Sequence, residues 1–209
     1  GTVRWLKEPG SASLGQNTQL IPGTGNSIEI AVIPTITATL LGSAASLALY
    51  RYESPGKKVL QALLFPPIAI PWLITGTAML IFFFGIGIGR GLVAILLGHV
   101  ALALPYVIVV VSARLQTFAP ELEEAARSLG ANQWQVTMRV TLPWIMPGVI
   151  AGGLFAFAVS FDQFVVSYFL STPGQTTLPV EIYAAIRKGF TPEINAVSTI
   201  IIVVSMALM

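Results

Sequence analysis

Long apolar segments occupy most of this chain, and they limit what it can fold into. A helix that crosses a membrane needs about 20 mostly apolar residues. Four segments reach that length: 26–50, 59–84, 91–115 and 145–170. A fifth begins near Ile194 and is still apolar where the sequence stops. The sequence therefore predicts an all-α membrane protein, a polytopic helical bundle with five visible spans.

The composition supports the same class and excludes others. Of the 209 residues, 55% are hydrophobic and only 10% are charged, and the mean hydropathy is +0.80. A soluble domain carries about 25% charged residues, so this chain cannot cover a water-facing surface. Its 11 basic and 9 acidic residues nearly balance, which argues against a nucleic-acid partner. With no cysteine and one histidine, the sequence predicts no catalytic cluster and no metal site.

Basic residues in short loops give an orientation. The loop at 51–58 holds three of them, and loops rich in Lys and Arg face the cytoplasm. Placing 51–58 and 115–144 inside, and counting Arg114 with the second loop, leaves six basic residues inside and five outside, so the density of the first loop carries the argument. This orientation predicts that 171–193 lies outside.

The two ends of the sequence are predicted to be incomplete. Residues 1–25 contain no apolar run and are predicted to be an external loop, with Asn26-Ser27 capping the first span. Bacterial membrane proteins usually start inside, so we expect a further span before Gly1 and six spans in the native protein. The transmembrane domain is predicted over 26–209, and its last helix is expected to continue beyond Met209.

The segment at about 116–143 is too polar to span and too patterned for a simple linker. Pro120 can open a helix, and three acidic residues in its first turns favour the positive helix end. Gly130 is placed to stop that helix. A second short helix is predicted over 132–141 and ends at Leu142-Pro143. The pattern predicts a helix–turn–helix at the cytoplasmic face.

Two interpretations of this loop remain open. It is either a solvated connector or a docking element for a partner. In the second case Ala125 and Ala126 let a partner surface approach closely, while Glu124 and Arg127 remain available for charged contacts.

The same residues resemble a family motif. Glu124-Ala125-Ala126, then Gly130, then Val140 and Leu142-Pro143 at their spacing, resemble the EAA motif of permease subunits in binding-protein-dependent ABC importers. Val140 stands where that family usually has isoleucine. The segments at 48–57, 160–167 and 177–196 resemble permeases of the spermidine/putrescine type.

The resemblance implies partners that this chain does not contain. It implies ABC ATPase subunits, two of them, carrying ATP and Mg; a second, non-identical permease; an external solute-binding protein; and a bacterial inner (cytoplasmic) membrane. No G-x-x-x-x-G-K-[ST] segment occurs here, so no cofactor is expected in this chain. A polyamine is the expected solute, and an aminophosphonate or opine is the alternative.

Polar and aromatic residues inside the spans are candidates for a substrate path. Asp162 is the main one, since an acid in a span usually faces water or the bundle interior. Its structural alternative is pairing with helix-end amides or Ser160. His99 is expected to be a packed, hydrogen-bonded residue more often than a path residue, and Tyr106 and Phe161 are expected either to line the path or to pack.

Two other classes compete with an importer permease. An ion-coupled secondary transporter would use intramembrane charges or broken helices as its coupling site. Asp162 gives that class little support, and it has no use for an EAA loop. A membrane-embedded enzyme would need a catalytic cluster, which the spans do not supply.

The second span is predicted to be kinked. Its prolines Pro66, Pro67 and Pro71 interrupt the hydrogen bonds of a helix.

Overall fold

The computed structural model describes residues 20–51, 62, 69–188, 199 and 203. Within these residues every regular element is a helix. The helices follow in this order: α1 (Leu20–Arg51), α4 (Trp72–Gly85), α5 (Leu92–Gln116), α6 (Glu121–Ser128), α7 (Gln133–Val136), the π-helix η2 (Thr137–Thr141), α8 (Leu142–Phe161), α9 (Val165–Leu170) and α10 (Leu178–Lys188).

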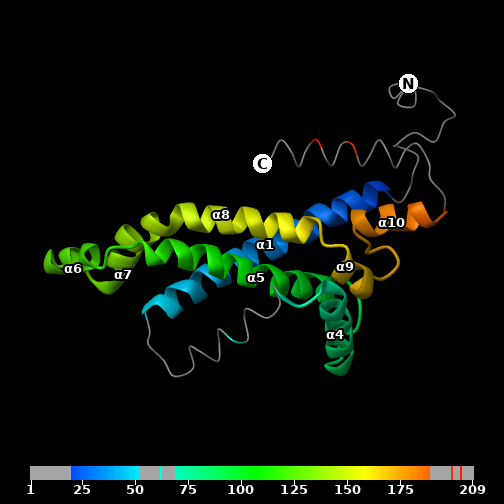
Figure 1. The fold of residues 1–209 in the computed structure, drawn as a ribbon, viewed down its shortest axis with the longest axis horizontal. Helices are drawn as coiled ribbons and strands as arrows, with labels where there is room; N and C mark the ends of the chain where they lie inside the picture. The colour runs from blue at the N-terminus through cyan, green and yellow to red at the C-terminus, as the bar shows by residue number, and fades with distance from the viewer. Residues whose placement is uncertain (1–19, 52–61, 63–68, 189–198, 200–202, 204–209) are drawn as a thin grey trace.

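Three long helices, α1, α5 and α8, pack against one another along the molecule (Figure 1). Glycines let them approach closely. A Cβ atom on Gly42 of α1 would lie 2.8 Å from Val107 of α5, and one on Gly148 of α8 would lie 2.9 Å from Arg114. Because lipid is as apolar as these side chains, such close packing is what holds membrane helices together.

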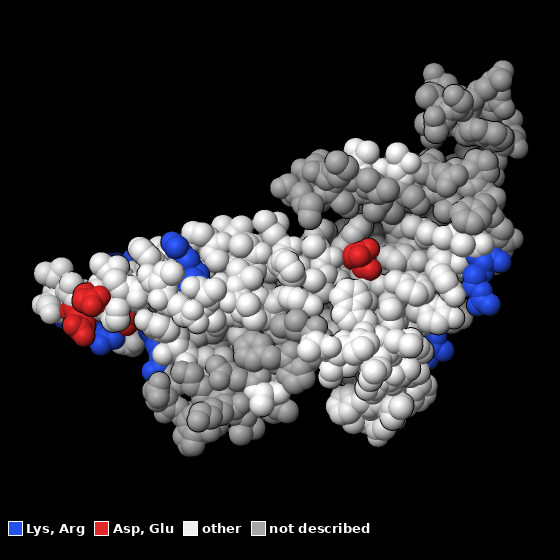
Figure 2. Space-filling model, viewed as in Figure 1, with Lys and Arg blue, Asp and Glu red and all other residues white. Residues whose placement is uncertain are grey.

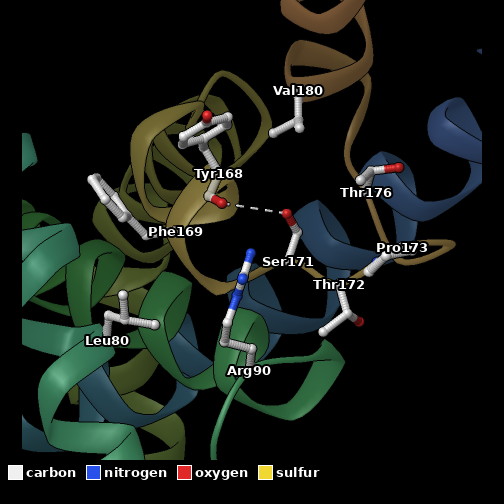
Figure 3. Close-up of a pocket in the computed structure, with 9 residues that line it drawn as sticks. All are labelled: Leu80, Arg90, Tyr168, Phe169, Ser171, Thr172, Pro173, Thr176 and Val180. Carbon is white, nitrogen blue, oxygen red and sulfur yellow. Dashed lines mark hydrogen bonds between the residues drawn. The ribbon is translucent and has the colours of Figure 1, made fainter.

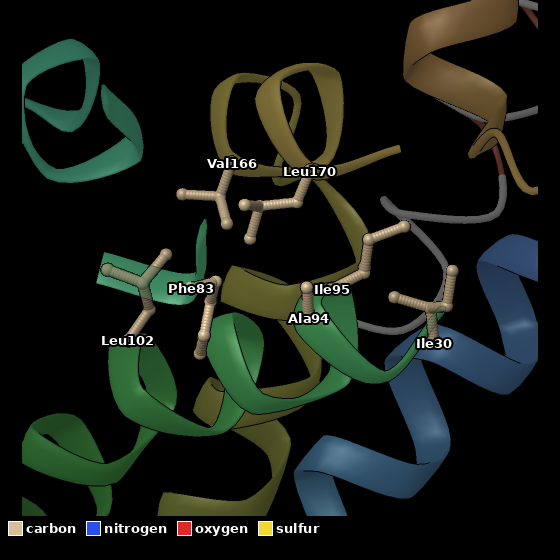
Figure 4. Packing of buried hydrophobic residues seen from close by; sticks show 7 residues of the cluster. All are labelled: Ile30, Phe83, Ala94, Ile95, Leu102, Val166 and Leu170. Atoms are coloured by element: carbon tan, nitrogen blue, oxygen red, sulfur yellow. The ribbon is translucent and has the colours of Figure 1, made fainter. Parts of the chain in front are cut away.

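A second packing unit joins α4 and α9 to one end of this bundle. Its core contains residues from α1, α4, α5 and α9, and Figure 4 shows their side chains converging: Ile30, Phe83, Ala94, Ile95, Leu102, Val166 and Leu170. Gly98 of α5 faces α9, where an added Cβ would lie 3.0 Å from Leu170. The short helices are thereby fixed to the long ones.

In the part of the chain that the structure describes, three helices are long and apolar enough to cross a membrane: Gly25–Arg51, Leu92–Gln116 and Gln133–Phe161. The predicted spans 26–50 and 91–115 are thus confirmed as helices. The predicted span 59–84 is described only in part, as the 14-residue α4, which begins after Pro71. The span predicted from Ile194 lies almost wholly outside the described residues, as do Pro66, Pro67 and most of 1–25.

The prediction of one continuous span over 145–170 is wrong. Helix α8 ends at Phe161, and α9 starts at Val165 after a non-helical segment. The side chain of Gln163 accepts a hydrogen bond from the backbone N–H of Val165 at 3.2 Å. This side chain replaces a backbone acceptor that the interrupted helix no longer provides.

The predicted cap of the first span is wrong, although the span itself is confirmed. Helix α1 begins at Leu20, so Asn26-Ser27 does not cap it. Instead, Asn26 donates from Nδ2 to the carbonyl of Thr176 at 3.1 Å, and Ser27 accepts from the N–H of Leu178 at 2.7 Å. The two residues therefore anchor the segment that leads into α10, a helix that the sequence did not predict.

Among the described residues, helix ends that were predicted to lie on the same side of the membrane lie close together. At one end of the bundle, the last residue of α1 contacts α6. At the other end, Gly91 donates its N–H to the carbonyl of Leu170 at 2.8 Å, close to the contacts of Asn26. Figure 1 shows α6 and α7 at the left end and α4, α9 and α10 towards the right end. The alternation of sides thus agrees with the predicted topology.

Candidate functional site

The loop that carries the EAA-like residues forms the polar end of the molecule. Helix α6 has Glu121, Glu123 and Glu124 in its first turn, where acidic groups favour the positive helix end. It ends as predicted at Gly130, whose φ is +88°. The N–H of Gly130 bonds to the carbonyl of Arg127, and the N–H of Ala131 bonds to that of Ala126. This pattern is a Schellman motif, in which glycine supplies the left-handed backbone.

The second predicted helix does not end at Leu142-Pro143, which corrects the sequence analysis. Asn132 caps α7 through a capping box with Gln135. From there α7, η2 and α8 form one continuous helix, Gln133–Phe161. The ring of Pro143 would clash with the carbonyl of Arg139 in a regular α-helix. Arg139 lies in the wider π-turn, which relieves that clash and lets the helix continue.

One surface of the loop is exposed and has both apolar and acidic groups. Leu129 is 89% exposed and Trp134 is 70% exposed. Glu124 and Ala125 are exposed beside them, and Ala126 is half-buried. Figure 2 shows acidic and basic groups gathered at this end, while most of the long face beside it is uncharged. Large apolar side chains that project from a polar loop are typical of a contact with another protein.

Glu123 points the other way, into the protein. Its side chain is 11% exposed, and both carboxylate oxygens have partners. Arg51 donates to Oε1 at 2.8 Å, Thr141 donates to the same oxygen at 2.6 Å, and Arg127 donates to Oε2 at 3.0 Å. Arg51 also donates to Thr137 at 2.8 Å. The sequence did not separate Glu123 from Glu124, because both fall in the same helical turn.

The surroundings of Glu123 shift its pKa. Partial burial raises the pKa of the carboxyl group, since it disfavours the charged form. The hydrogen bonds from Thr141 and Arg51 and the two guanidinium charges outweigh that effect, so the net pKa lies below its ordinary value. The group is therefore ionised at neutral pH and pairs with Arg51 as a carboxylate.

His99 lies in a buried polar network between helices. Its Nδ1 is 2.8 Å from the hydroxyl of Ser160, and its Nε2 is 2.9 Å from the hydroxyl of Ser167. The hydroxyl of Ser160 also lies 3.0 Å from the carbonyl of Ile30, and that of Ser167 lies 2.8 Å from the carbonyl of Gln163. Because a neutral imidazole has one N–H, one of the two hydroxyls accepts from His99 and the other donates to it. This geometry fits the packed, hydrogen-bonded interpretation of His99.

Asp162 lies at the break between α8 and α9. Its side chain is exposed, and its carboxylate has no hydrogen bond or ion pair to any residue that the structure describes. Pairing with Ser160, the structural alternative, does not occur, because that hydroxyl bonds to His99 and Ile30. Asp162 thus keeps its full capacity to bind a cation.

Asp162 also ends an exposed stripe along α8. The residues at helical spacing on this face are exposed in the part of the chain that the structure describes: Met146, Pro147, Ile150, Ala151, Leu154, Phe155, Ala158 and Asp162. Tyr106 packs on Phe155 with ring centroids 5.1 Å apart, so it lies beside the stripe. Phe161 stacks on Phe157 at 5.7 Å and is half-buried. The structure therefore brings Tyr106, but not His99, to this face.

A pocket of about 430 Å³ lies at the end opposite to the loop (Figure 3). Arg90, Tyr168 and Phe169 line it with hydroxyl-bearing residues of the 171–176 segment, and Figure 3 shows the Arg90 side chain directed towards Ser171. Among the described residues no acid lines this pocket, and the nearby Glu181 accepts a hydrogen bond from the hydroxyl of the lining residue Thr176. A cavity whose charged group is a guanidinium repels a cation, so it is a poor site for an amine.

Helices able to cross a membrane, with a polar helical loop at one end, are the features of an integral membrane protein. The chain belongs to the family of binding-protein-dependent transport system inner membrane components, whose model matches residues 38–209. It is accordingly a permease subunit of an ABC importer and not itself an enzyme. The match therefore confirms the family that the EAA-like residues indicated.

Three relatives illustrate the family. The chain is 36% identical to the spermidine/putrescine transport system permease protein PotC of Escherichia coli (strain K12), over 99% of this chain and 76% of the relative. It is 36% identical to the putrescine transport system permease protein PotI of the same strain, over 96% and 72%. It is 32% identical to the molybdenum transport system permease protein ModB of Mycobacterium bovis, over 87% and 74%.

Solved structures share the fold. An inward-facing form of the MetNI methionine ABC transporter has a TM-score of 0.77 at 20% identity and covers 94% of each chain. A bacterial ABC transporter for alginate import has a TM-score of 0.74 at 17% identity, covering 99% of this chain and 84% of the other. At these identities the likeness shows the fold alone.

Proposed function

We propose that this permease carries a polyamine, putrescine or spermidine, across the bacterial inner membrane. The observation that carries the proposal is the exposed, unpaired carboxylate of Asp162 at the end of the α8 stripe. A cation that leaves water needs a counter-charge, and this is the acid that the structure leaves free at the helix break. The polyamine permeases among the relatives agree with a cationic solute.

The exposed stripe of α8 faces a second permease in this proposal, and the path runs between the two. The surface with Leu129, Trp134 and Glu124 docks on an ATPase subunit in the cytoplasm, where ATP and Mg are bound. An external solute-binding protein delivers the polyamine at the opposite end, beside α9 and α10. Closure of two ATPase subunits moves the loop and reorients the helices, which gives alternating access.

Uptake by the assembled importer tests the proposal. The full-length permease is expressed with its partner subunits and binding protein in cells that lack other polyamine uptake. We expect saturable uptake of labelled putrescine or spermidine, and a co-purified chain with a P-loop. The relative that transports molybdenum shows that the family also serves other solutes. Uptake of an aminophosphonate, an opine or an oxyanion in place of both polyamines would overturn the assignment.

A further inference from the structure

Helix α6 has only one buried residue, and that residue is an acid. Glu123 is buried, whereas the other seven residues from Glu121 to Ser128 are exposed or half-buried. A helix of eight residues is unstable by itself and depends on tertiary contacts. The carboxylate of Glu123 is therefore a principal attachment of α6 to the rest of the protein.

That carboxylate joins α6 to two membrane helices at once. Arg51 is the last residue of α1, and its guanidinium spans the distance from Glu123 to Thr137 and Thr141 of the π-helix. The π-helix continues without interruption into α8. Each threonine hydroxyl accepts from Arg51 and donates elsewhere, Thr141 to Glu123 and Thr137 to the carbonyl of Gln133. Both terminal nitrogens of the Arg51 guanidinium are thus hydrogen-bonded, whereas its buried Nε has no partner among the described residues.

The two neighbouring acids thus have different environments. Glu124 is exposed on the side of α6 that carries the docking surface, and Glu123 faces the bundle. A half-buried pair with several hydrogen bonds is screened less by water and salt than a surface pair. Removing Glu123 would leave the partly buried charge of Arg51 without an acidic partner among the described residues, whereas removing Arg51 would leave Glu123 paired with Arg127 alone.

We propose that the Arg51–Glu123 ion pair is the link that transmits displacement of α6 to α1 and α8 during transport. This inference rests on the proposed function, in which an ATPase moves the loop. Glu123 and Arg51 are positioning residues: neither touches the solute or the ATPase. The pair stays formed throughout the cycle, so that α6, the end of α1 and the start of α8 move as one body.

Spin labels can test whether α6, the end of α1 and the start of α8 move as one body. The chain has no cysteine, so cysteines at Ser128 and Leu40, both exposed, can be labelled specifically. In the assembled importer with wild-type Glu123, we expect the same distance between the two labels without nucleotide and with ATP trapped. With Glu123→Gln we expect this distance to change on ATP binding. Uptake and stimulation of ATP hydrolysis by the binding protein should fall at least tenfold, while basal hydrolysis remains.

Glu121→Gln is the matched control, an acid in the same helical turn that is not part of the docking surface. It should leave the Ser128–Leu40 distance constant in both states, because Glu121 is exposed and its side chain forms no hydrogen bond or ion pair with any described residue. A different distance in the two states with wild-type Glu123, or wild-type uptake by Glu123→Gln, would overturn the inference. Absence of an ATPase from the wild-type complex would instead contradict the proposed function, so the two failures are distinguishable.

A covalent cross-link in place of the ion pair separates the transmission of motion from α6 to α1 from a simple loss of protein stability. Arg51→Cys combined with Glu123→Cys removes the ion pair and should abolish uptake. A short bifunctional maleimide that joins the two cysteines should restore at least half of the wild-type uptake. An assembled, cross-linked importer that remains inactive would contradict a mechanical role for this pair.

Discussion

The imidazole Nε2 of His99 lies 2.9 Å from the hydroxyl of Ser167, and this contact ties α5 to α9 across the break that follows α8. The other ring nitrogen holds Ser160, on the near side of the same break. One buried side chain therefore fixes the spacing of the two helix ends between which Asp162 is presented. The position of Asp162 relative to the path follows from this spacing, because the carboxylate of Asp162 has no partner among the described residues.

Replacing His99 should destabilise the protein without altering solute specificity. His99→Ala removes two buried hydrogen bonds and opens a cavity, so we expect a loss of about 2–4 kcal/mol in the free energy of unfolding. His99→Gln keeps some hydrogen-bonding capacity and should cost less. Thermal unfolding of the purified permease measures both. An unchanged unfolding midpoint in His99→Ala would show that the network contributes little.

Asp162→Asn should reduce uptake of a polyamine at least tenfold, because it removes the counter-charge and keeps the size. Assembly with the ATPase should be unchanged, since Asp162 lies far from the loop. Glu29→Gln is the control: it neutralises another exposed acid, near the start of α1, and should retain most of the uptake. Initial uptake rates in whole cells compare the two. Equal rates for Asp162→Asn and wild type would make Asp162 a structural residue.

Gly130 should tolerate asparagine better than valine. Its φ of +88° is the constraint, since a Cβ atom there would meet nothing within 4 Å. Asparagine enters the left-handed region readily, whereas a β-branched residue is strained there. We expect Gly130→Val to lower uptake several-fold and Gly130→Asn to retain most of it. If both variants were equally impaired, side-chain size and not backbone conformation would govern this turn.

Trp134→Ala should weaken ATPase binding. The ring is 70% exposed in this chain, and exposed aromatic anchors often dominate an interface. We expect at least a tenfold lower recovery of the ATPase during purification, with normal membrane insertion. Tyr168→Ala, which removes a 41% exposed ring at the opposite end, should leave recovery unchanged. Equal losses in the two variants would indicate general misfolding and not a docking surface at Trp134.

The Arg51–Glu123 pair should be insensitive to pH across the physiological range. The pKa of Glu123 lies below its ordinary value of 4.5, so the carboxylate contributes stability above that pH. This contribution is lost as the pH falls through the lowered pKa. The difference in unfolding free energy between wild type and Glu123→Gln should therefore stay constant from pH 8 to about 5 and shrink below 4.5. A difference that already disappears near pH 7 would exclude an ionised pair.

Hydropathy predicted the long helices well and their interruptions poorly. The segment 145–170 is apolar enough to look continuous, yet Gln163 and Ser167 satisfy backbone groups that a broken helix exposes. The polar residues Ser160, Asp162 and Gln163 were the available signal for that break. The opposite error occurred at Pro143, where the sequence suggested a stop and the π-turn lets the helix continue.

The loop was located from its residues, but the roles within it were not. Periodicity placed Glu123 and Glu124 in one helical turn and could not tell which side chain faces the bundle. That difference depends on Arg51, 72 positions away from Glu123, and on Thr141. Contacts between such distant positions follow from the packing of α1 and α8, which a single sequence does not disclose. The exposure of Leu129 and Trp134 was missed for the same reason.

The uninterrupted helix from Gln133 to Phe161 has the geometry of a lever. At a rise of about 1.5 Å per residue its 29 residues extend over about 42 Å, with the π-turn near one end and Asp162 directly after the other. A tilt of about 5° about the loop end would move the far end by about 4 Å, close to the rise of one helical turn, about 5.4 Å. A small rotation at the polar end of the molecule is thus sufficient to move the carboxylate of Asp162 by a distance similar to the size of an ammonium group.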